Sequence, residues 1–214
     1  MGDCCCCCSG NLPIGIQLYT VRDVCEQDFK ATCKALAYLG YKGFEFAGNY
    51  GGMTPCELKS FLDEIGVVAC GIHTGLDEIG NPDSQLYAYV EALGVKYVTT
   101  SLAGDVASNW LPIIERVKEV AKVAKSKGIA FTYHNHSQEL AEIDGKYALD
   151  ILYEGTCAET VKGEPDVYWL KKGGVDPVPY LKKYPGRFPQ IHLKDMDEAG
   201  DFTEIGRASC RERV

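Results

Sequence analysis

Short apolar runs alternate along the chain with longer stretches in which apolar residues recur at helical spacing. A run of roughly four to eight apolar residues is typical of a buried strand, and a period near 3.6 of an amphipathic helix. The pattern predicts strands at Ile14–Tyr19, Gly43–Phe46, Val67–His73, Val95–Thr100, Ile129–His136, Asp166–Trp169 and Gln190–Lys194. The helices predicted between them are Asp28–Leu39, Thr54–Ile65, Pro82–Leu93, Trp110–Lys127, Lys146–Tyr153 and Pro177–Lys183.

Helix-boundary residues support this assignment. Thr54 precedes Pro55, and Glu57 follows three positions after Thr54, which is the pattern of a capping box with proline in the first turn. A glycine also stands between a predicted helix and the next strand at Gly40, Gly66, Gly94 and Gly128. Glycine commonly ends a helix because it adopts the left-handed backbone conformation without strain.

Strict alternation of strands and helices predicts a parallel sheet covered by helices. A doubly wound open sheet is the alternative to a barrel. Seven predicted strands, the lack of a dinucleotide-binding glycine motif after the first, and strands with one apolar and one polar face favour the barrel. We therefore expect a (β/α)₈ TIM barrel over residues 13–204, truncated after about the seventh strand.

The two ends of the sequence differ from the middle. Residues 1–12 contain five consecutive cysteines, Cys4 to Cys8, which pair poorly with one another, so we expect a disordered leader. Metal binding and palmitoylation are the alternatives for this run. Residues 205–214 read IGRASCRERV and resemble a translated sequencing adapter, so we expect a non-native tail. The cysteines between these ends are expected to be buried, reduced thiols, namely Cys25, Cys33, Cys56, Cys70 and Cys157.

Charge and hydropathy argue against some classes of binding partner. The formal net charge of −8 argues against a nucleic-acid backbone as ligand, because phosphate binding needs clustered basic residues. The sequence has neither an apolar stretch of the roughly 18 residues that span a bilayer nor a recognisable secretory signal. We expect a cytoplasmic protein that acts on a small molecule. The oligomeric state stays open.

The polar faces of the predicted strands carry the candidate catalytic and metal-ligating residues. Side chains alternate across a strand, so one set should point into the barrel and meet at the carboxyl ends of the strands. This set is Gln17, Glu45, His73, His134, His136, Asp166, His192 and Lys194. It contains all four histidines of the chain. A lone histidine is usually structural, but burying so many polar groups is costly unless they bind something. Imidazole with carboxylate suits a divalent ion such as Mn²⁺, Co²⁺, Fe²⁺ or Zn²⁺, with Mg²⁺ also possible.

Several segments also resemble a known family, the sugar phosphate isomerase/epimerase or xylose isomerase-like barrels, in the branch labelled inosose dehydratase or isomerase-like. The resemblance covers about residues 13–206 and rests on IGIQLYTVRD, GYKGFEFAGNYGG, YHNHSQEL, DVYWLKKGGVDPVPYLKKYPGRFPQIHLKDM and GDFTEIG. It implies a metal with one ligand from each of the last four strands. Asp166 and His192 match the ligands of the sixth and seventh strands, and His134 stands where the fifth strand normally supplies a glutamate. The eighth-strand ligand, usually glutamate, has no counterpart in these residues.

The resemblance implies an order of chemical events. A metal polarises a sugar oxygen, and a base removes the proton from the adjacent carbon to give an enediolate. Glu45 and His136 are the base candidates, and Lys194 is the candidate for stabilising the oxyanion. Gln17 and His73 are expected to bind substrate. A salt bridge between Glu45 and Lys194 is the alternative for Glu45. Stacking on a sugar ring is an alternative for Trp169 and Tyr168, but Trp169 is on the helix-facing phase of its predicted strand, so a core position is the favoured interpretation for it.

We therefore expect a metal-dependent isomerase or epimerase acting on a sugar or cyclic polyol. A lyase or dehydratase acting on a keto-inositol or keto-glycoside is the alternative, because it begins with the same proton abstraction. An abasic-site endonuclease and a non-catalytic binding domain are further alternatives, and the acidic charge speaks against the endonuclease. No glycine-rich phosphate loop is apparent, so we do not expect a phosphorylated substrate.

Overall fold

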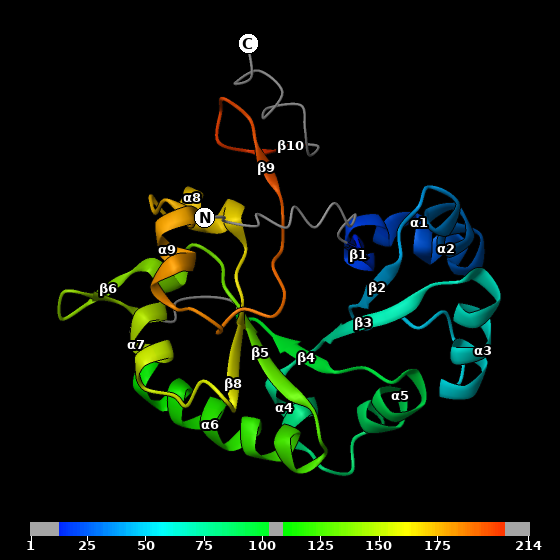
Figure 1. Cartoon of the computed structure of the whole chain (residues 1–214), viewed down its shortest axis with the longest axis horizontal. Coiled ribbons are helices and arrows are strands. Elements are labelled where there is room, and N and C mark those ends of the chain that lie inside the picture. Colours follow the sequence, from blue (N-terminus) through cyan, green and yellow to red (C-terminus); the bar gives the residue numbers. More distant parts are fainter. Residues whose placement is uncertain (1–12, 103–108, 204–214) are drawn as a thin grey trace, which may run out of the picture.

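A computed structural model describes residues 13–102 and 109–203. The expected leader, residues 1–12, and the expected tail, residues 205–214, lie outside these described residues. Figure 1 shows the strands near the middle of the molecule and the helices arranged around them in an arc. Within the described ranges, no helix is both long and apolar enough to span a membrane.

Six parallel strands form the main sheet, and they pair in the order in which they occur in the sequence. They are β1 (Gly15–Gln17), β2 (Gly43–Phe46), β3 (Val68–His73), β4 (Tyr97–Thr100), β5 (Ala130–His134) and β8 (Val161–Glu164). A doubly wound sheet reverses its strand order at a switch point, whereas a barrel adds each new strand beside the last. The uninterrupted order confirms the predicted α/β barrel topology.

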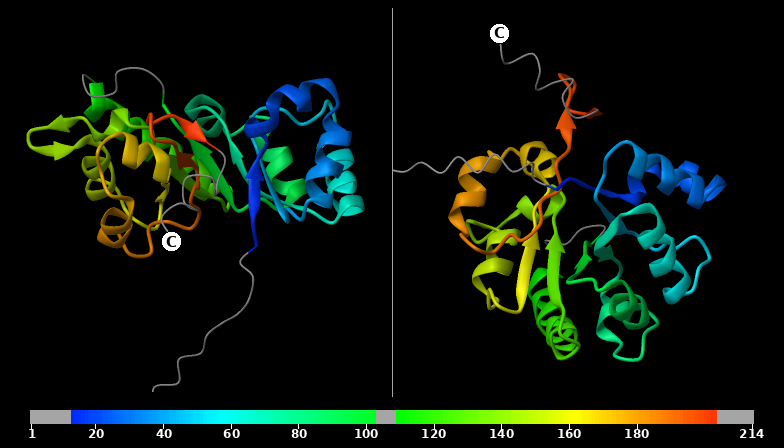
Figure 2. Two further views of the ribbon diagram at one scale, coloured as in Figure 1. Left: turned by 90° about the horizontal axis from the view of Figure 1, so that it is seen from above. Right: turned by 45° about the vertical axis from the view of Figure 1, so that its right-hand side comes forward.

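The helices pack on the outer face of this sheet (Figures 1 and 2). They are α1 (Arg22–Gln27), α2 (Phe29–Tyr38), α3 (Pro55–Ile65), α4 (Leu76–Gly80), α5 (Leu86–Leu93), α6 (Trp110–Ser126), α7 (Ala148–Glu154), α8 (Val167–Lys172) and α9 (Pro177–Lys183). Two short 3₁₀ turns, Leu18–Val21 and Gln138–Leu140, follow β1 and β5. At α3 the predicted capping box is present, since Thr54 N donates to Glu57 Oε2 at 2.8 Å. The helix ends at Gly66, whose φ is 69°.

The core lies between the sheet and the helices. Phe44 and Phe46 of β2 and Phe131 and Tyr133 of β5 are fully buried, and Trp110 of α6 packs edge-on against Tyr133 with ring centroids 6.1 Å apart. The alternate positions of the same strands carry polar side chains. The predicted division into an apolar outer face and a polar inner face is therefore present in these strands.

The predicted strand at Asp166–Trp169 is wrong. The strand is β8, five positions earlier, and residues 167–172 form α8. Pro165 has no backbone N–H to continue the ladder, so the strand ends at Glu164. Asp166 is a strong N-cap residue, and its Oδ1 accepts a hydrogen bond from Trp169 N at 3.1 Å.

The predicted strand at Gln190–Lys194 is reduced to one parallel bridge between Asp166 and His192. His192 N donates to Pro165 O at 2.9 Å, and Val167 N donates to His192 O at 3.1 Å. Beyond this point the neighbouring chain turns into α8, so no ladder can continue. A small antiparallel hairpin follows, formed by β9 (Asp195–Met196) and β10 (Phe202–Thr203). Within the described residues, β1 pairs with β2 alone.

Other predicted boundaries shift by smaller amounts. The helix predicted from Pro82 starts at Leu86, after the separate short helix α4. The helix predicted from Lys146 starts at Ala148 instead, because Lys146–Tyr147 is a strand, β7, that pairs with β6 (Glu142–Ile143). Asp144 and Gly145 form the turn between them with φ values of 51° and 76°. This is the Asp-Gly signal of a tight hairpin.

Candidate functional site

The carboxyl ends of the strands bring the predicted polar residues together. Gln17, His73 and His134 are the last residues of β1, β3 and β5, and Glu45 is the penultimate residue of β2. His192 reaches the same place through its bridge to Asp166. We call the group formed by buried Glu45, His134, Glu164 and Asp166 with half-buried His192 the mouth cluster.

Glu45 lies between two histidines. Its side chain is 4% exposed, and His192 Nε2 donates to its Oε2 at 2.7 Å. Gln17 Nε2 donates to its Oε1 at 3.3 Å, and His73 Nδ1 lies 3.6 Å from the same oxygen. Burial alone would raise the pKa of Glu45, but the hydrogen bonds from His192 and His73 outweigh it and lower that pKa. Glu45 is therefore an ionised carboxylate with both oxygens occupied.

The hydrogen bond between Glu45 and His192 raises the pKa of His192. Burial alone would lower the pKa of His192, but its hydrogen bond to Glu45 and the charge of Glu164 raise that pKa. His73 completes the arrangement, with its Nδ1 3.2 Å from Gln17 Nε2 and its Nε2 3.0 Å from Ser101 Oγ. The two predicted substrate-binding residues, Gln17 and His73, thus lie in direct contact beside Glu45.

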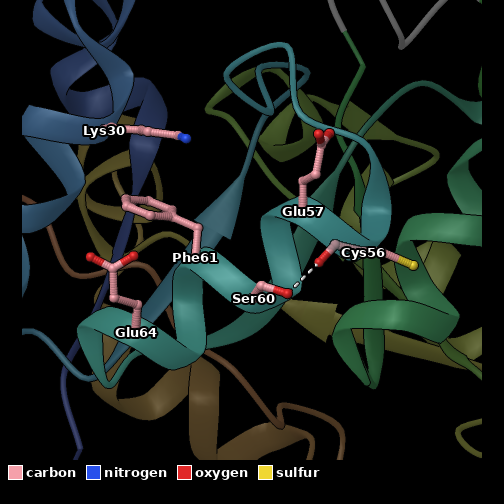
Figure 3. A pocket seen from close by; sticks show the side chains of 6 residues that line it. All are labelled: Lys30, Cys56, Glu57, Ser60, Phe61 and Glu64. Atoms are coloured by element: carbon pink, nitrogen blue, oxygen red, sulfur yellow. Dashed lines mark hydrogen bonds between the residues drawn. The ribbon is translucent and has the colours of Figure 1, made fainter.

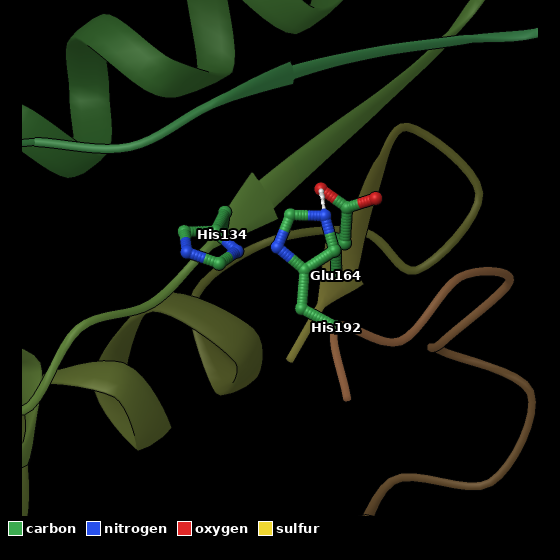
Figure 4. Close-up of side chains that lie close together, drawn as sticks. All are labelled: His134, Glu164 and His192. Carbon is green, nitrogen blue, oxygen red and sulfur yellow. Dashed lines mark ion pairs between the residues drawn. The ribbon is translucent and has the colours of Figure 1, made fainter. Parts of the chain in front are cut away.

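A second group in the mouth cluster has the geometry of a metal site. One donor atom from each of His134, Glu164 and His192 lies within 4.8 Å of the other two (Figure 4). His134 is 3% exposed and Glu164 is 1% exposed. Glu164 Oε2 lies 3.5 Å from His192 Nε2. His134 Nδ1 and Glu164 Oε2 are buried without a hydrogen-bond partner among the described residues.

The electrostatics of this group also favour a cation. Burial, reinforced by the charge of Glu45, raises the pKa of Glu164 to about 8. Burial, reinforced by positive charge on His192, holds the pKa of His134 well below its usual range. A divalent ion would favour an ionised carboxylate and a neutral imidazole, and it would occupy the unpartnered atoms. The donor set therefore fits such an ion.

Asp166 and Lys194 form a pair at the edge of this group. Asp166 is fully buried, and its Oδ2 lies 2.5 Å from Lys194 Nζ and 3.7 Å from His134 Nε2. The backbone N–H of Asp166 donates to Asn135 Oδ1 at 3.1 Å. The alternative that pairs Lys194 with Glu45 is wrong, since Lys194 pairs with Asp166. Asp166 lies near His134, but it is paired with a lysine, and the groups whose donor atoms lie within 4.8 Å of one another contain Glu164 instead of Asp166.

His136 lies just beyond the end of β5. Its ring centroid is 5.2 Å from that of His134 and 5.1 Å from that of Trp169. Burial lowers its pKa, and its Nδ1 is buried without a partner among the described residues. Its backbone N–H donates to Glu139 Oε2 at 2.9 Å, while Tyr133 OH donates to Glu139 Oε1 at 2.8 Å. Glu139 thereby fixes the loop that carries His136.

Two residues at the mouth were missed by the sequence interpretation. Glu164 was overlooked because the strand was placed too late, and the following Pro165 was the available signal that the strand ends there. Trp169 was interpreted as core, yet its ring borders His136. The register of one strand therefore decided which carboxylate and which aromatic residue were assigned to the site.

The open hollows on the outer surface are of a different kind. One of about 400 Å³ lies over α3 and is lined by Lys30, Cys56, Glu57, Ser60, Phe61 and Glu64 (Figure 3). Within it, Ser60 Oγ donates to Cys56 O, a bond within a single helix turn. None of the predicted site residues lines this hollow, so the strand ends remain the candidate site.

Comparison with known proteins agrees with the fold. No family profile matches the sequence. A sugar phosphate isomerase/epimerase from Parabacteroides distasonis has a similar structure, with a TM-score of 0.73 and 23% identity over 87% of this chain and 77% of that chain. A probable 3-DHS dehydratase from Bacillus anthracis is also similar, with a TM-score of 0.68 and 14% identity over 88% of this chain and 75% of that one. The chain therefore has the xylose isomerase-like TIM-barrel fold, which confirms the resemblance at the level of the fold.

Among curated proteins, the sequence is similar to the inosose dehydratase of Geobacillus kaustophilus. The two are 24% identical over 187 residues, which cover 75% of this chain and 60% of that protein. The chain thus spans less than two thirds of that relative's length. The relative and both structural neighbours are named as isomerases, epimerases or dehydratases, which supports the prediction of an enzyme.

Proposed function

We propose that this chain carries the catalytic centre of a metal-dependent isomerase or epimerase that moves a proton next to the carbonyl of a sugar or cyclic polyol. The observation that carries the proposal is the buried group of His134, Glu164 and His192 at the mouth of a xylose isomerase-like barrel. Two of its donor atoms lack partners, which is costly unless a ligand meets them.

His134, His192 and Glu164 would hold the divalent ion, with Asp166 as the adjacent carboxylate. When bound, such an ion polarises a carbonyl or hydroxyl oxygen of the substrate and makes the neighbouring C–H more acidic. Glu45 accepts a hydrogen bond from His192 Nε2 and so fixes the orientation of this ring, which would leave His192 Nδ1 as the nitrogen for the ion. A carboxylate that orients a ligating histidine is a common support of metal sites.

The two proposed bases, Glu45 and His136, differ in whether their acceptor atoms already have hydrogen-bond partners. Both oxygens of Glu45 are occupied and its pKa is lowered, so it is a weak base. His136 has a lowered pKa and an unpartnered Nδ1, so at neutral pH it is uncharged and able to accept a proton. We therefore favour His136 as the base and Glu45 as the residue that orients His192.

The remaining predicted residues would bind the substrate and stabilise the charge that develops on it. Lys194 lies beside Asp166 at the edge of the centre, where its positive charge would stabilise an oxyanion that develops on the substrate. Gln17 and His73 lie within 3.2 Å of each other and would hold substrate hydroxyl groups. With these roles, every predicted site residue acts at the same end of the barrel.

A dehydratase is the second candidate, and the similarity to an inosose dehydratase favours it. Both reactions begin with removal of the proton next to the carbonyl. They differ in the next step, since an isomerase returns a proton whereas a dehydratase expels a hydroxide from the adjacent carbon.

The test is incubation with Mn²⁺ and a panel of keto-sugars and inososes in D₂O, followed by mass spectrometry and NMR. Deuterium at the carbon next to the carbonyl, lost in His136→Gln, is the expected result. A product lighter by one water would select the dehydratase. If no compound of the panel exchanges a proton or loses water, the proposed function is wrong.

A further inference from the structure

A row of rings leads from the buried centre to the surface. The rings follow one another in the order His134, His136, Trp169 and Phe202, with successive centroids 5.2, 5.1 and 5.3 Å apart. His134 is 3% exposed, whereas Phe202 is 53% exposed. The row therefore starts at the metal-site candidate and ends in solvent. We call its outer part, Trp169 and Phe202 with Lys194, the aromatic wall.

Phe202 is held in place from behind. Its ring lies 3.9 Å from that of Tyr168 at an angle of 33°. The hairpin that carries Phe202 is tied to α8, because Tyr168 OH and Lys172 Nζ both donate to Gly200 O, at 3.2 Å and 2.6 Å. An exposed ring that is fixed on one side offers a rigid apolar surface at little entropic cost to a ligand.

Polar atoms accompany these rings. Lys194 Nζ lies 6.0 Å from the centroid of Trp169 and 5.4 Å from that of Phe202. Trp169 Nε1 and His136 Nδ1 are buried and have no hydrogen-bond partner among the described residues. A buried indole N–H usually finds a partner. Apolar surface with a few unpaired polar atoms is the composition of a small-molecule site.

We propose that the aromatic wall is a subsite for a second sugar ring, so that the substrate is a glycoside or oligosaccharide whose reacting ring lies at His134, Glu164 and His192. This inference rests on the proposed function for the position of the reacting ring. A sugar ring has an apolar face of C–H groups and a polar rim of hydroxyls. The face matches the exposed ring of Phe202, beside which the ring of Trp169 stands at 88°, and the rim matches Lys194.

The charge at the wall indicates a neutral second ring. The only cation beside both rings in the described structure is Lys194, and its ammonium group is already paired with Asp166 at 2.5 Å. Because Lys194 also serves the reacting ring, a phosphate or carboxylate on the second ring would meet no further cation beside Trp169 and Phe202 in the described structure. The subsite suits an uncharged sugar.

The test is isothermal titration calorimetry of the full chain with cellobiose, maltose, lactose and xylobiose, compared with glucose, galactose and xylose. We expect at least one disaccharide to bind about tenfold or more tightly than its component monosaccharides. Phe202→Ala should remove this advantage and leave monosaccharide binding unchanged, and Phe202→Tyr should restore it.

Tyr38→Ala is the matched control, since Tyr38 is an aromatic residue on α2 that is 92% exposed. It should leave the disaccharide advantage intact. If no disaccharide binds better than its monosaccharides, or if the advantage survives in Phe202→Ala, the subsite is wrong.

The subsite and the proposed function can fail separately. Stabilisation by Mn²⁺ that disappears in His192→Ala reports on the metal centre alone. A disaccharide advantage that depends on Phe202 without any effect of Mn²⁺ would retain the subsite and refute the metal centre. Stabilisation by Mn²⁺ without a disaccharide advantage would refute the subsite and retain the centre.

Discussion

Two polar clusters in this molecule, each built around buried carboxylates, differ in how completely their atoms are paired. The first, which we call the Asp150 cluster, joins α7 to α9 and consists of Asp150, Tyr180, Lys183 and Tyr184. Asp150 is 6% exposed and its Oδ1 accepts hydrogen bonds from Tyr180 OH at 2.9 Å and Tyr184 OH at 2.7 Å. Its Oδ2 accepts one from Lys183 Nζ at 2.8 Å. Both carboxylate oxygens are therefore paired.

The carboxylates of the mouth cluster are as buried as Asp150, but the cluster is incompletely paired. His134 Nδ1 and Glu164 Oε2 lack partners there among the described residues. A buried polar atom without a partner costs about 1–3 kcal/mol of stability. The comparison teaches that burial of charge alone does not mark a functional site. What distinguishes the mouth cluster is that its unpaired atoms belong to residues whose potential ligand atoms lie within 4.8 Å of one another.

The largest expected loss of stability comes from a substitution in the Asp150 cluster. Asp150→Ala leaves two tyrosine hydroxyls and a lysine without their acceptor, so we expect a loss of about 2–4 kcal/mol in the free energy of unfolding. Urea unfolding followed by circular dichroism measures it. The control is Asp63→Ala, which removes a carboxylate from the exposed pair with Lys59 and should cost about 0.5 kcal/mol or less. Equal losses in the two variants would contradict a structural role for Asp150.

The two clusters should also respond to pH with opposite signs. Hydrogen bonds from Lys183 and the tyrosines outweigh burial and lower the pKa of Asp150 below its ordinary 3.8, so its stabilisation is present above that pH and is lost as the pH falls further. The pKa of Glu164 is raised by burial from 4.5 to about 8, so metal-free stability falls as the pH rises through that window.

Unfolding free energies of the metal-free protein between pH 3 and pH 9 measure both trends. Glu164→Gln should flatten the fall between about pH 4.5 and 8 and gain about 1–3 kcal/mol over the wild type near the upper end. Asp150→Asn should flatten only the acid limb. If Glu164→Gln is less stable than the wild type at every pH, the mouth cluster is a structural ion pair and the comparison fails.

The smallest expected loss of stability comes from removing a single hydroxyl group of the Asp150 cluster. Tyr184→Phe removes one of the two hydroxyls bonded to Asp150 Oδ1 and leaves Tyr180 in place. We expect a loss of about 0.5–1.5 kcal/mol, the net contribution of one hydrogen bond. Thermal unfolding with the double variant Tyr180→Phe/Tyr184→Phe shows whether the two bonds are independent. A single variant as damaging as Asp150→Ala would mean that packing, rather than pairing, holds α9.

The sequence predicted the first five strands because each is a short apolar run followed by a helix. It predicted helix α3 because its capping residues are close together in the sequence. It misplaced β8 because Val161–Glu164 contains lysine, glycine and glutamate, and the apolar Val167–Trp169 that follows is the more strand-like run. The Asp-Gly turn at Asp144 was a local signal that the interpretation overlooked.

The candidate site was predictable to the extent that strand phase determines it. Gln17, His73 and His134 end their strands, as alternation requires. Glu164 was missed with the register of β8. The Asp150 cluster could not be predicted, since its partners lie 30 to 34 positions away and no periodic pattern connects them. The ring row to Phe202 likewise depends on a hairpin with weak local signals.

The most direct test of the account is the thermal stabilisation of the chain by Mn²⁺. Binding to the native state alone should add about 2.7 kcal/mol at a hundredfold excess over Kd. We predict that His192→Ala and Glu164→Gln abolish most of the shift, that Asp166→Asn shows how much the adjacent carboxylate adds, and that Glu64→Gln, at an exposed pair with Lys34, leaves the shift unchanged. A full shift in His192→Ala and Glu164→Gln would contradict the metal centre proposed for the mouth cluster.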